Sequence, residues 1–219
     1  MIFLLDNDNP AFPDPRVIPE EERDPDGFFA IGGDLSPERL TQAYSHGIFP
    51  WYSFRDEPIQ WFCPMDRFVI FPSEIHVSHS MRTLINKGTF QVTFDQDFAG
   101  VIGNCSKLRI NHEGAWLGPQ MVQAYTRMHH LGLAHSVEVW QQGRLVGGLY
   151  GIFLRQAFFG ESMFSLAPSA SKLALIHLAH RMQAIGGRFI DCQFETPHLL
   201  TMGGRHITYD EYLSLLGPQ

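Results

Sequence analysis

The stretch His135-Ser-Val-Glu-Val-Trp-Gln-Gln-Gly-Arg144 decides the fold of this chain. Its first six residues alternate between polar and apolar side chains, which is the pattern of a half-buried strand. Gln142-Gly143 then predicts a hairpin turn. A second strand is expected over residues 144–153 and a third over residues 156–164. We therefore predict an antiparallel three-stranded meander.

Helices flank this meander in the sequence. One is predicted over residues 120–131 and ends at Gly132, and another is capped by Ser169 and runs to about residue 185. A short buried strand follows over residues 188–192. The order helix, meander, helix, strand is that of an N-acetyltransferase-like (GNAT-type) acyltransferase domain. We therefore predict the α+β class, with a mixed sheet.

The chain before residue 64 has a different character. Its opening residues are rich in Pro, Asp and Gly, which predicts loops and short strands. Ser36 followed by Pro37 predicts the start of a helix, and Gly47 predicts its end. We expect a small N-terminal domain over residues 1–64 and the GNAT-like domain over residues 65–219.

Shorter elements complete the predicted order. Two short strands or loops are expected within residues 58–72, helices over residues 79–87 and 98–102, and a strand over residues 90–94. The capping box Thr208-x-x-Glu211 predicts the start of a last helix.

Composition places the chain among ordinary globular proteins, with 219 residues, 44% hydrophobic residues and a net charge of −7. The acidic balance argues against broad nucleic-acid binding, which needs Lys and Arg, but leaves room for a local basic patch. No apolar run approaches the ~20 residues of a membrane span, and Met1-Ile-Phe-Leu-Leu5 is interpreted as a first strand rather than a signal peptide. The three cysteines are scattered without a CxxC pair, so we expect no disulfide framework, no metal and a cytoplasmic location.

Two stretches place polar side chains among residues typical of buried strands, Phe159-Gly-Glu-Ser-Met-Phe-Ser165 and Phe189-Ile-Asp-Cys-Gln193. Asp191 and Gln193 stand two apart, so on a strand both side chains would point to the same face. Burying these groups together with Glu161 is costly unless they are paired. The residues alone leave two interpretations open, a structural polar network and an active site.

Two kinds of acyl-transfer chemistry are disfavoured. Acyl-CoA enzymes of the predicted fold hold the pyrophosphate on a glycine-rich turn before the helix, whereas Leu166-Ala-Pro-Ser-Ala-Ser171 has no glycine and lacks one N–H donor at Pro168. A nucleophilic serine would need a GxSxG elbow, which is missing, and Ser162 has no identifiable base. Cys192 falls on the opposite strand face from Asp191 and is expected to face the core.

Several unusual strings occur along the chain. They are Ala30-Ile-Gly-Gly-Asp-Leu-Ser-Pro37, Gly47-Ile-Phe-Pro-Trp51, Ala134-His-Ser-Val-Glu138, Val146-Gly-Gly-Leu-Tyr-Gly151, Gly160-Glu-Ser-Met-Phe-Ser165, Ala170-Ser-Lys172 and Ile190-Asp-Cys-Gln193. With these strings the chain resembles the leucyl/phenylalanyl-tRNA–protein transferases from Phe12 to the last helix. The resemblance implies transfer of Leu, Phe or Met from an aminoacyl-tRNA to the α-amino group of proteins that begin with Arg or Lys, which marks them for N-end rule degradation. It also implies direct aminolysis of the tRNA ester by a monomer, without a cofactor.

The resemblance further implies roles for particular residues. Five match the positions that line the pocket for the donor side chain: Leu149, Phe158, Met163, Leu178 and Ile190. Trp51 and Trp116 match residues that contact the terminal adenosine, and Arg82 and Lys87 match a basic cluster for the tRNA acceptor stem. Core packing is the rival interpretation for the apolar residues and for both tryptophans.

The chain departs from the family's common residues at several of these places. Thr83 and Asn86 stand where basic residues are frequent, so Arg67 or Arg109 is expected to help hold the tRNA. Ala115, Leu149 and Leu178 also differ from the residues that are common in the family at these positions. These differences are expected to affect which donor amino acid, Leu, Phe or Met, is preferred.

The three polar residues fit aminolysis. Gln193 would orient the attacking amine through its side-chain oxygen, and Asp191 would polarise Gln193 or stabilise developing positive charge. Glu161, with Asp191, would pair with the basic first residue of the acceptor. Two rival hypotheses stay open, a non-catalytic protein that binds the aminoacyl end and an acyl-CoA N-acetyltransferase.

Overall fold

The computed structural model describes residues 1–51, 58–110 and 117–217, with residues 109 and 110 described by their backbone alone. The N-terminal part of the chain contains a four-stranded sheet with the strand order β1-β2-β4-β3. Its strands are β1 (Phe3–Leu5), β2 (Phe28–Gly32), β3 (Phe49–Pro50) and β4 (Gln60–Phe62). Helix α1 (Pro37–Ser45) begins as predicted, because the Ser36 hydroxyl accepts a hydrogen bond from the backbone N–H of Arg39.

A seven-stranded mixed sheet carries the rest of the chain, in the order β11-β5-β10-β9-β8-β7-β6. Its strands are β5 (Asp66–Ile70), β6 (Gln91–Phe94), β7 (Ala134–Gln141), β8 (Arg144–Leu154), β9 (Ala157–Ser165), β10 (Phe189–Asp191) and β11 (Arg205–Thr208). All neighbours are antiparallel except β9 and β10, which run parallel. The predicted meander β7-β8-β9 and the mixed α+β class are confirmed.

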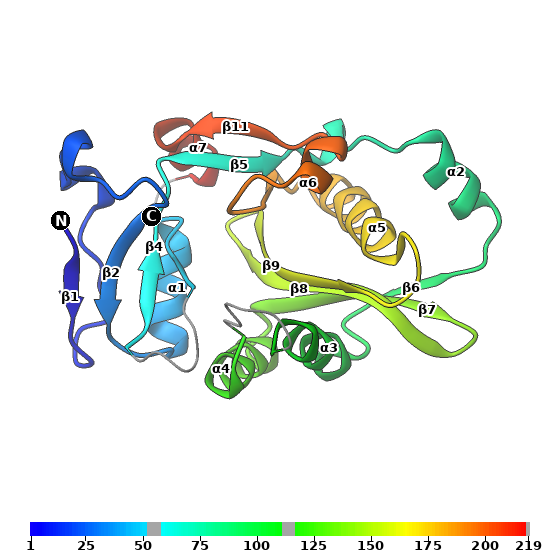
Figure 1. Cartoon of the computed structure of the whole chain (residues 1–219), viewed down its shortest axis with the longest axis horizontal. Coiled ribbons are helices and arrows are strands. Elements are labelled where there is room, and N and C mark those ends of the chain that lie inside the picture. Colours follow the sequence, from blue (N-terminus) through cyan, green and yellow to red (C-terminus); the bar gives the residue numbers. More distant parts are fainter. Residues whose placement is uncertain (52–57, 111–116, 218–219) are drawn as a thin grey trace.

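Helices cover both faces of the large sheet. Helix α5 (Ala170–Ala184) packs on one face, and α3 (Phe98–Ile110) and α4 (Pro119–His130) pack on the other (Figure 1). The other α-helices of the described residues are α2 (His79–Asn86), α6 (Pro197–Thr201) and α7 (Tyr209–Leu216). None of the described helices is long and apolar enough to cross a membrane.

Two local predictions were wrong, the end of α3 and the side-chain cap of α5. Helix α3 extends far beyond residue 102, because Val101, Ile102 and Cys105 bury one side of it on the sheet and packing overrides the weak helix former Gly103. The strand predicted over residues 188–192 is present as β10, whereas neither α6 nor β11 was foreseen. Ser169 precedes α5 but its side chain makes no capping hydrogen bond.

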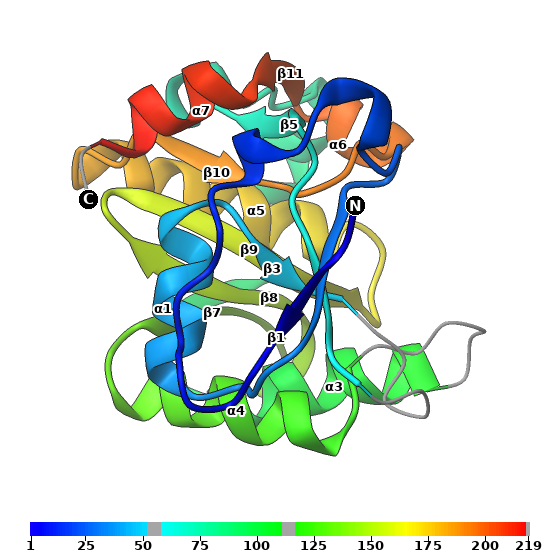
Figure 2. The same cartoon turned by 90° about the vertical axis from the view of Figure 1, so that its left-hand side faces the viewer.

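The two sheets share one hydrophobic core. Helix α1 lies between β4 and the large sheet (Figure 1), and Figure 2 shows it from the end that carries β1. Its Tyr44 packs on Phe159 of β9, with the ring centroids 5.1 Å apart. The same core contains Trp61 of the small sheet and Tyr212 of α7. A second core cluster lies between α5 and the opposite sheet face.

Candidate active site

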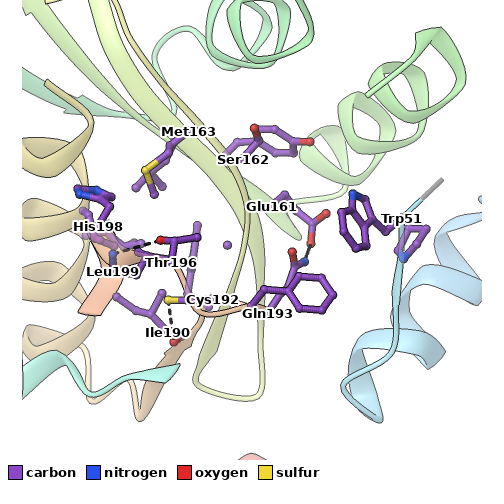
Figure 3. Close-up of a pocket in the computed structure, with 18 residues that line it drawn as sticks. Trp51, Glu161, Ser162, Met163, Ile190, Cys192, Gln193, Thr196, His198 and Leu199 are labelled. Atoms are coloured by element: carbon purple, nitrogen blue, oxygen red, sulfur yellow. Dashed lines mark hydrogen bonds between the residues drawn. The ribbon is translucent and has the colours of Figure 1, made fainter. Parts of the chain in front are cut away.

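A cavity of about 550 Å³ opens beside β9 and β10. One end is apolar and is formed by residues from β8, β9, β10 and α5, which are Leu149, Phe158, Met163, Leu175, Leu178 and Ile190. The other end carries Glu161, Gln193 and Trp51 (Figure 3). The structure therefore brings the five predicted pocket residues together with two of the three predicted polar residues.

A β-bulge explains why neighbouring residues of β9 line the same cavity. Tyr150 pairs with Ser162 and Gly151 pairs with Gly160, so Glu161 is an extra residue without a partner on β8. A bulge interrupts strict alternation and re-aims side chains. Glu161, Ser162 and Met163 consequently all line the cavity, although they are consecutive in the chain.

Glu161 is the centre of a buried polar network. Its Oε1 accepts hydrogen bonds from the Tyr44 hydroxyl at 2.7 Å and from Gln193 Nε2 at 2.9 Å, and its Oε2 accepts one from the Tyr125 hydroxyl at 2.8 Å. Burial raises the pKa of Glu161 to about 7, with a smaller contribution from the charge of Asp191. The three donors act in the opposite direction, because they stabilise the carboxylate.

Sequence reasoning missed Tyr44 and Tyr125. Tyr44 lies on α1 and Tyr125 on α4, separated from Glu161 by 117 and 36 positions. The only local signal is that each tyrosine falls on the apolar side of its helix, which is equally typical of core packing. Their convergence on Glu161 is a product of the tertiary fold.

Asp191 does not share a face with Gln193, so that prediction was wrong. Strand β10 ends at Asp191, and Gln193 has a left-handed backbone with φ of 65°. The Asp191 carboxylate is fully buried outside the cavity wall, where it pairs with the Arg67 guanidinium and accepts a hydrogen bond from the Tyr212 hydroxyl at 2.8 Å. Its second oxygen accepts from the backbone N–H of Gln193 at 2.9 Å, so Asp191 shapes the turn that aims Gln193 into the cavity.

These contacts also correct two further expectations. Arg67 is fully buried against Asp191 and the backbone oxygen of Gly47, so it is not a surface contact for tRNA. Asp191 already has a cation, and the oxygens of Glu161 already have three donors. Neither carboxyl is therefore placed to pair with the basic residue of an acceptor.

Comparisons with known proteins place the chain in a family. Residues 69–217 match the model of the leucyl/phenylalanyl-tRNA protein transferase, and residues 33–65 match the model of its N-terminal domain. The leucyl/phenylalanyl-tRNA–protein transferase of Azotobacter vinelandii is 48% identical over 99% of this chain and 94% of its own length. That of Chromohalobacter salexigens is 51% identical over 94% of this chain and 79% of its own length.

The chain belongs to the leucyl/phenylalanyl-tRNA–protein transferase family. It is an aminoacyltransferase, and the family resemblance drawn from its sequence motifs is confirmed.

Two solved structures are distantly similar to this transferase. The structure of L-PGS from Bacillus licheniformis aligns with a TM-score of 0.43 at 10% identity, over 75% of this chain and 52% of that one. A conserved protein of unknown function from Bacteroides thetaiotaomicron aligns with a TM-score of 0.46 at 10% identity, over 87% of this chain and 66% of that one. The transferase thus spans about half of the first chain and about two thirds of the second, and these scores are too low to support the GNAT-type assignment.

The residues predicted to contact tRNA have different surroundings. Trp51 is 39% exposed, contacts Phe194 with ring centroids 4.9 Å apart, and stands near Glu161 and Gln193 at the cavity (Figure 3). Arg82 and Lys87 are exposed on and just after α2 and do not line the cavity. Trp116 and Ala115 lie outside the described residues, as does the side chain of Arg109.

Cys192, Ser162 and His198 are among the further polar side chains that line the cavity of this transferase. Cys192 is half-buried and faces both the cavity and the core under α5, and burial raises the pKa of its thiol, which argues against a nucleophile. Ser162 Oγ and His198 Nε2 are buried without a hydrogen-bond partner in the described part of the chain. These two atoms offer hydrogen bonds to a bound molecule in a largely apolar cavity.

A second cavity of about 440 Å³ borders the first, and Gln193 and Phe194 line both. Its wall is acidic, with carboxylates from Glu20, Asp24, Asp26, Asp66 and Glu195. Arg23 and His206 are the basic residues of this wall, and His206 bridges Asp66 and Glu195. Within residues 1–51, 58–110 and 117–217, no group of three His, Cys, Asp or Glu side chains is placed to hold a metal ion.

Proposed function

We propose that this transferase moves Leu, Phe or Met from an aminoacyl-tRNA to the α-amino group of proteins that begin with Arg or Lys. The observation that carries the proposal is that one cavity, of about 550 Å³, contains both the apolar pocket and the polar groups of Gln193 and Glu161. An aminoacyl ester bound with its side chain in that pocket would present its carbonyl carbon beside Gln193.

The apolar end of the cavity supports the donor preference. Burying a Leu, Phe or Met side chain there contributes ~1.5–3 kcal/mol, and Met163 is flexible enough to fit more than one of them. Trp51, with Trp116, is proposed to contact the terminal adenosine, for which stacking contributes ~1–3 kcal/mol per base. Arg82 and Lys87 are proposed to contact the acceptor stem through their positive charge.

Direct aminolysis requires only positioning of the amine and the ester. The unprotonated amine attacks the carbonyl carbon, a C–N bond forms, and the ester C–O bond breaks. The ester oxygen of the terminal ribose leaves the carbonyl carbon and takes up the proton that the amine gives up, so that the tRNA departs with a free hydroxyl. Gln193 donates its Nε2 hydrogen to Glu161, so its amide oxygen remains to accept an N–H of the attacking amine. This mechanism uses no cofactor.

The acidic second cavity supports the acceptor preference. It meets the first cavity at Gln193, where the acceptor amine would stand. An Arg or Lys side chain extending from that amine would enter a wall rich in carboxylates and gain charge-assisted hydrogen bonds. This cavity replaces Glu161 and Asp191 as the proposed place for the acceptor's positive charge.

The remaining features of the proposal follow from the family. We propose a cytoplasmic monomer that marks proteins for N-end rule degradation. We also propose that residues 1–64 form a small N-terminal domain and residues 65–219 a GNAT-type domain, in agreement with the order helix, meander, helix, strand.

The decisive experiment is transfer of labelled Leu from Leu-tRNA to three peptides that differ only in their first residue, Arg, Lys or Ala. Labelling of the Arg and Lys peptides but not of the Ala peptide is expected. Equal labelling of all three would overturn the acceptor preference. No labelling at all, with tRNA still bound, would leave a non-catalytic binding protein.

A further inference from the structure

Four oxygen atoms form a closed ring beneath the reacting end of the cavity. The Tyr44 and Tyr125 hydroxyls are 2.5 Å apart. The Tyr44 hydroxyl lies 2.7 Å from Glu161 Oε1, and the Tyr125 hydroxyl lies 2.8 Å from Glu161 Oε2. All three contacts are within the range of O–H···O hydrogen bonds, and the ring closes through the Glu161 carboxyl carbon.

The ring needs more protons than the tyrosines supply. Each of the three contacts requires one hydrogen between its two oxygens, so three are needed. Burial holds the pKa of both phenols well above their usual value, so each keeps its proton and the two together supply two. An ionised Glu161 supplies none, and one pair of oxygens would then face each other without a hydrogen. That arrangement is costly in a buried site.

We infer that the Glu161 carboxyl carries the third proton, and that Glu161, Tyr44 and Tyr125 together are positioning residues for Gln193. The geometry of the ring by itself requires this proton. The claim about positioning rests on the proposed function of Gln193.

The contacts also determine which oxygen of Glu161 is protonated. Oε1 already accepts from Tyr44 and from Gln193 Nε2, so it acts as the carbonyl oxygen. The proton therefore lies on Oε2, and the contact with Tyr125 reverses the direction that it has with an ionised Glu161. Oε2 then donates to the Tyr125 hydroxyl, which donates to Tyr44, which donates to Oε1. Every hydrogen then has an acceptor, and Oε1 still receives the Gln193 amide.

The charged surroundings agree with a neutral Glu161. Asp191 from β10 is the neighbouring carboxylate, and it disfavours a second negative charge. The Arg67 guanidinium from β5 is committed to Asp191 and to the oxygen of Gly47. The Gln193 amide that faces Glu161 is neutral, and Tyr150 from β8 adds a further phenol, whose ring lies 5.5 Å from that of Tyr125.

The ring has a direct consequence for the amide of Gln193. A neutral acid with its carbonyl oxygen toward Gln193 accepts only an N–H, so the amide nitrogen is held at Glu161 and the amide oxygen is directed elsewhere. Tyr44 comes from α1 and Tyr125 from α4, and both contact Glu161 of β9. The orientation of the Gln193 amide therefore depends on the positions of these two helices. Loss of the proton would remove one of the three hydrogen bonds that close the ring.

The proton can be observed directly by infrared difference spectroscopy of unmodified protein against Glu161→Gln, with glutamate labelled by ¹³C. At about pH 6 we expect the carbonyl band of a protonated carboxyl in the wild-type protein and its absence from the variant. The band should diminish with a midpoint of about 7. Only carboxylate bands at about pH 6 would overturn the inference. This outcome does not depend on whether the protein transfers amino acids.

The positioning role is tested by single-turnover transfer with Glu161→Ala and Glu161→Gln. Glu161→Ala should lower the rate about tenfold or more, since the Gln193 amide loses its acceptor. Glu161→Gln should restore most of that loss, because its amide N–H replaces the proton on Oε2. Exposed Glu38 on α1 offers a matched control, Glu38→Gln. Equal loss in both Glu161 variants, with the control fully active and circular dichroism unchanged, would contradict the positioning role.

Discussion

Gln193 lies where the two cavities meet and lines both of them. Its left-handed backbone carries it out of the strand and into the cavity, and the contact from its N–H to Asp191 supports that conformation. Left-handed geometry costs a non-glycine residue ~1 kcal/mol. The side chain rather than the backbone must therefore explain why glutamine stands there.

We expect Gln193→Ala to lower the transfer rate about tenfold to a hundredfold while leaving the affinity for aminoacyl-tRNA nearly unchanged. In the proposed mechanism the amide orients the amine and contributes little to donor binding. Single-turnover rates and tRNA binding should be measured side by side. Gln183→Ala, at an exposed position on α5, is the matched control. Equal loss of rate and affinity would show that Gln193 binds tRNA instead.

The Asp191 carboxylate contacts the Arg67 guanidinium, the Tyr212 hydroxyl and the backbone N–H of Gln193, so we propose that it acts on the fold more than on the reaction. Asp191→Asn leaves the buried Arg67 guanidinium without its counter-charge. We expect a loss of about 3–5 kcal/mol in the free energy of unfolding, read from urea denaturation. Asp8→Asn, at an exposed position, should change it by less than about 0.5 kcal/mol. A stable Asp191→Asn protein that fails to transfer would instead favour a direct role in the reaction.

Glu161 should make the stability of the protein depend on pH. The raised pKa means that the folded protein holds a proton that the unfolded chain releases above its ordinary pKa of 4.5. Stability should therefore fall as pH rises from that value to about 7, relative to Glu161→Gln. Melting temperatures of the two proteins across this range provide the measurement. A constant difference between them would mean that Glu161 does not titrate there.

At the scale of elements, the spacing between α5 and β8 shapes the apolar end of the cavity. A Cβ added at Gly147 would lie 2.4 Å from the Cβ of Ala170, so only glycine permits this approach. A Cβ at Gly103 of α3 would meet nothing within 4 Å. A larger residue is therefore excluded by close packing at Gly147 but has room at Gly103, although both glycines lie inside regular elements.

We expect Gly147→Ala to destabilise the protein by about 1–3 kcal/mol, because α5 must shift from the sheet. Gly103→Ala should stabilise it by up to ~1 kcal/mol, because alanine is the better helix former. Denaturation midpoints of the two variants measure the contrast. The Gly147 variant should also bind Leu-tRNA more weakly, since α5 carries Leu175 and Leu178. Similar stability of both variants would refute the close-packing argument.

At the scale of the whole molecule, the small sheet and the large one build the site together. The N-terminal part supplies Tyr44, Trp51 and much of the acidic cavity, while the large sheet supplies Glu161 and the apolar pocket. The proposed donor and acceptor sides meet at Gln193, which lines both cavities. This arrangement allows donor and acceptor recognition to be separated by mutation.

We expect the double change Asp26→Asn and Glu20→Gln to raise the KM for an Arg-initiated peptide several-fold without changing tRNA affinity, because both side chains face the acidic cavity. The effect should weaken as salt is added. Steady-state assays with varied peptide give the value, and Glu38→Gln serves as control. An unchanged KM would remove the acidic cavity from acceptor binding.

The sequence by itself determined the meander, the helices on either side of it, most caps and the family. These features depend on hydrogen bonds and periodicity within a few residues, as at Ser36 and in the Thr208 to Glu211 capping box. It also identified the apolar pocket residues, which the structure places together. Only the tertiary structure decided how the polar residues pair. Arg67 and Asp191 are 124 positions apart, Tyr44 and Glu161 are 117 apart, and a bulge in β9 overrides the alternation expected of a strand. Burial and proton sharing depend on what packs around a group in space, and no local pattern records it.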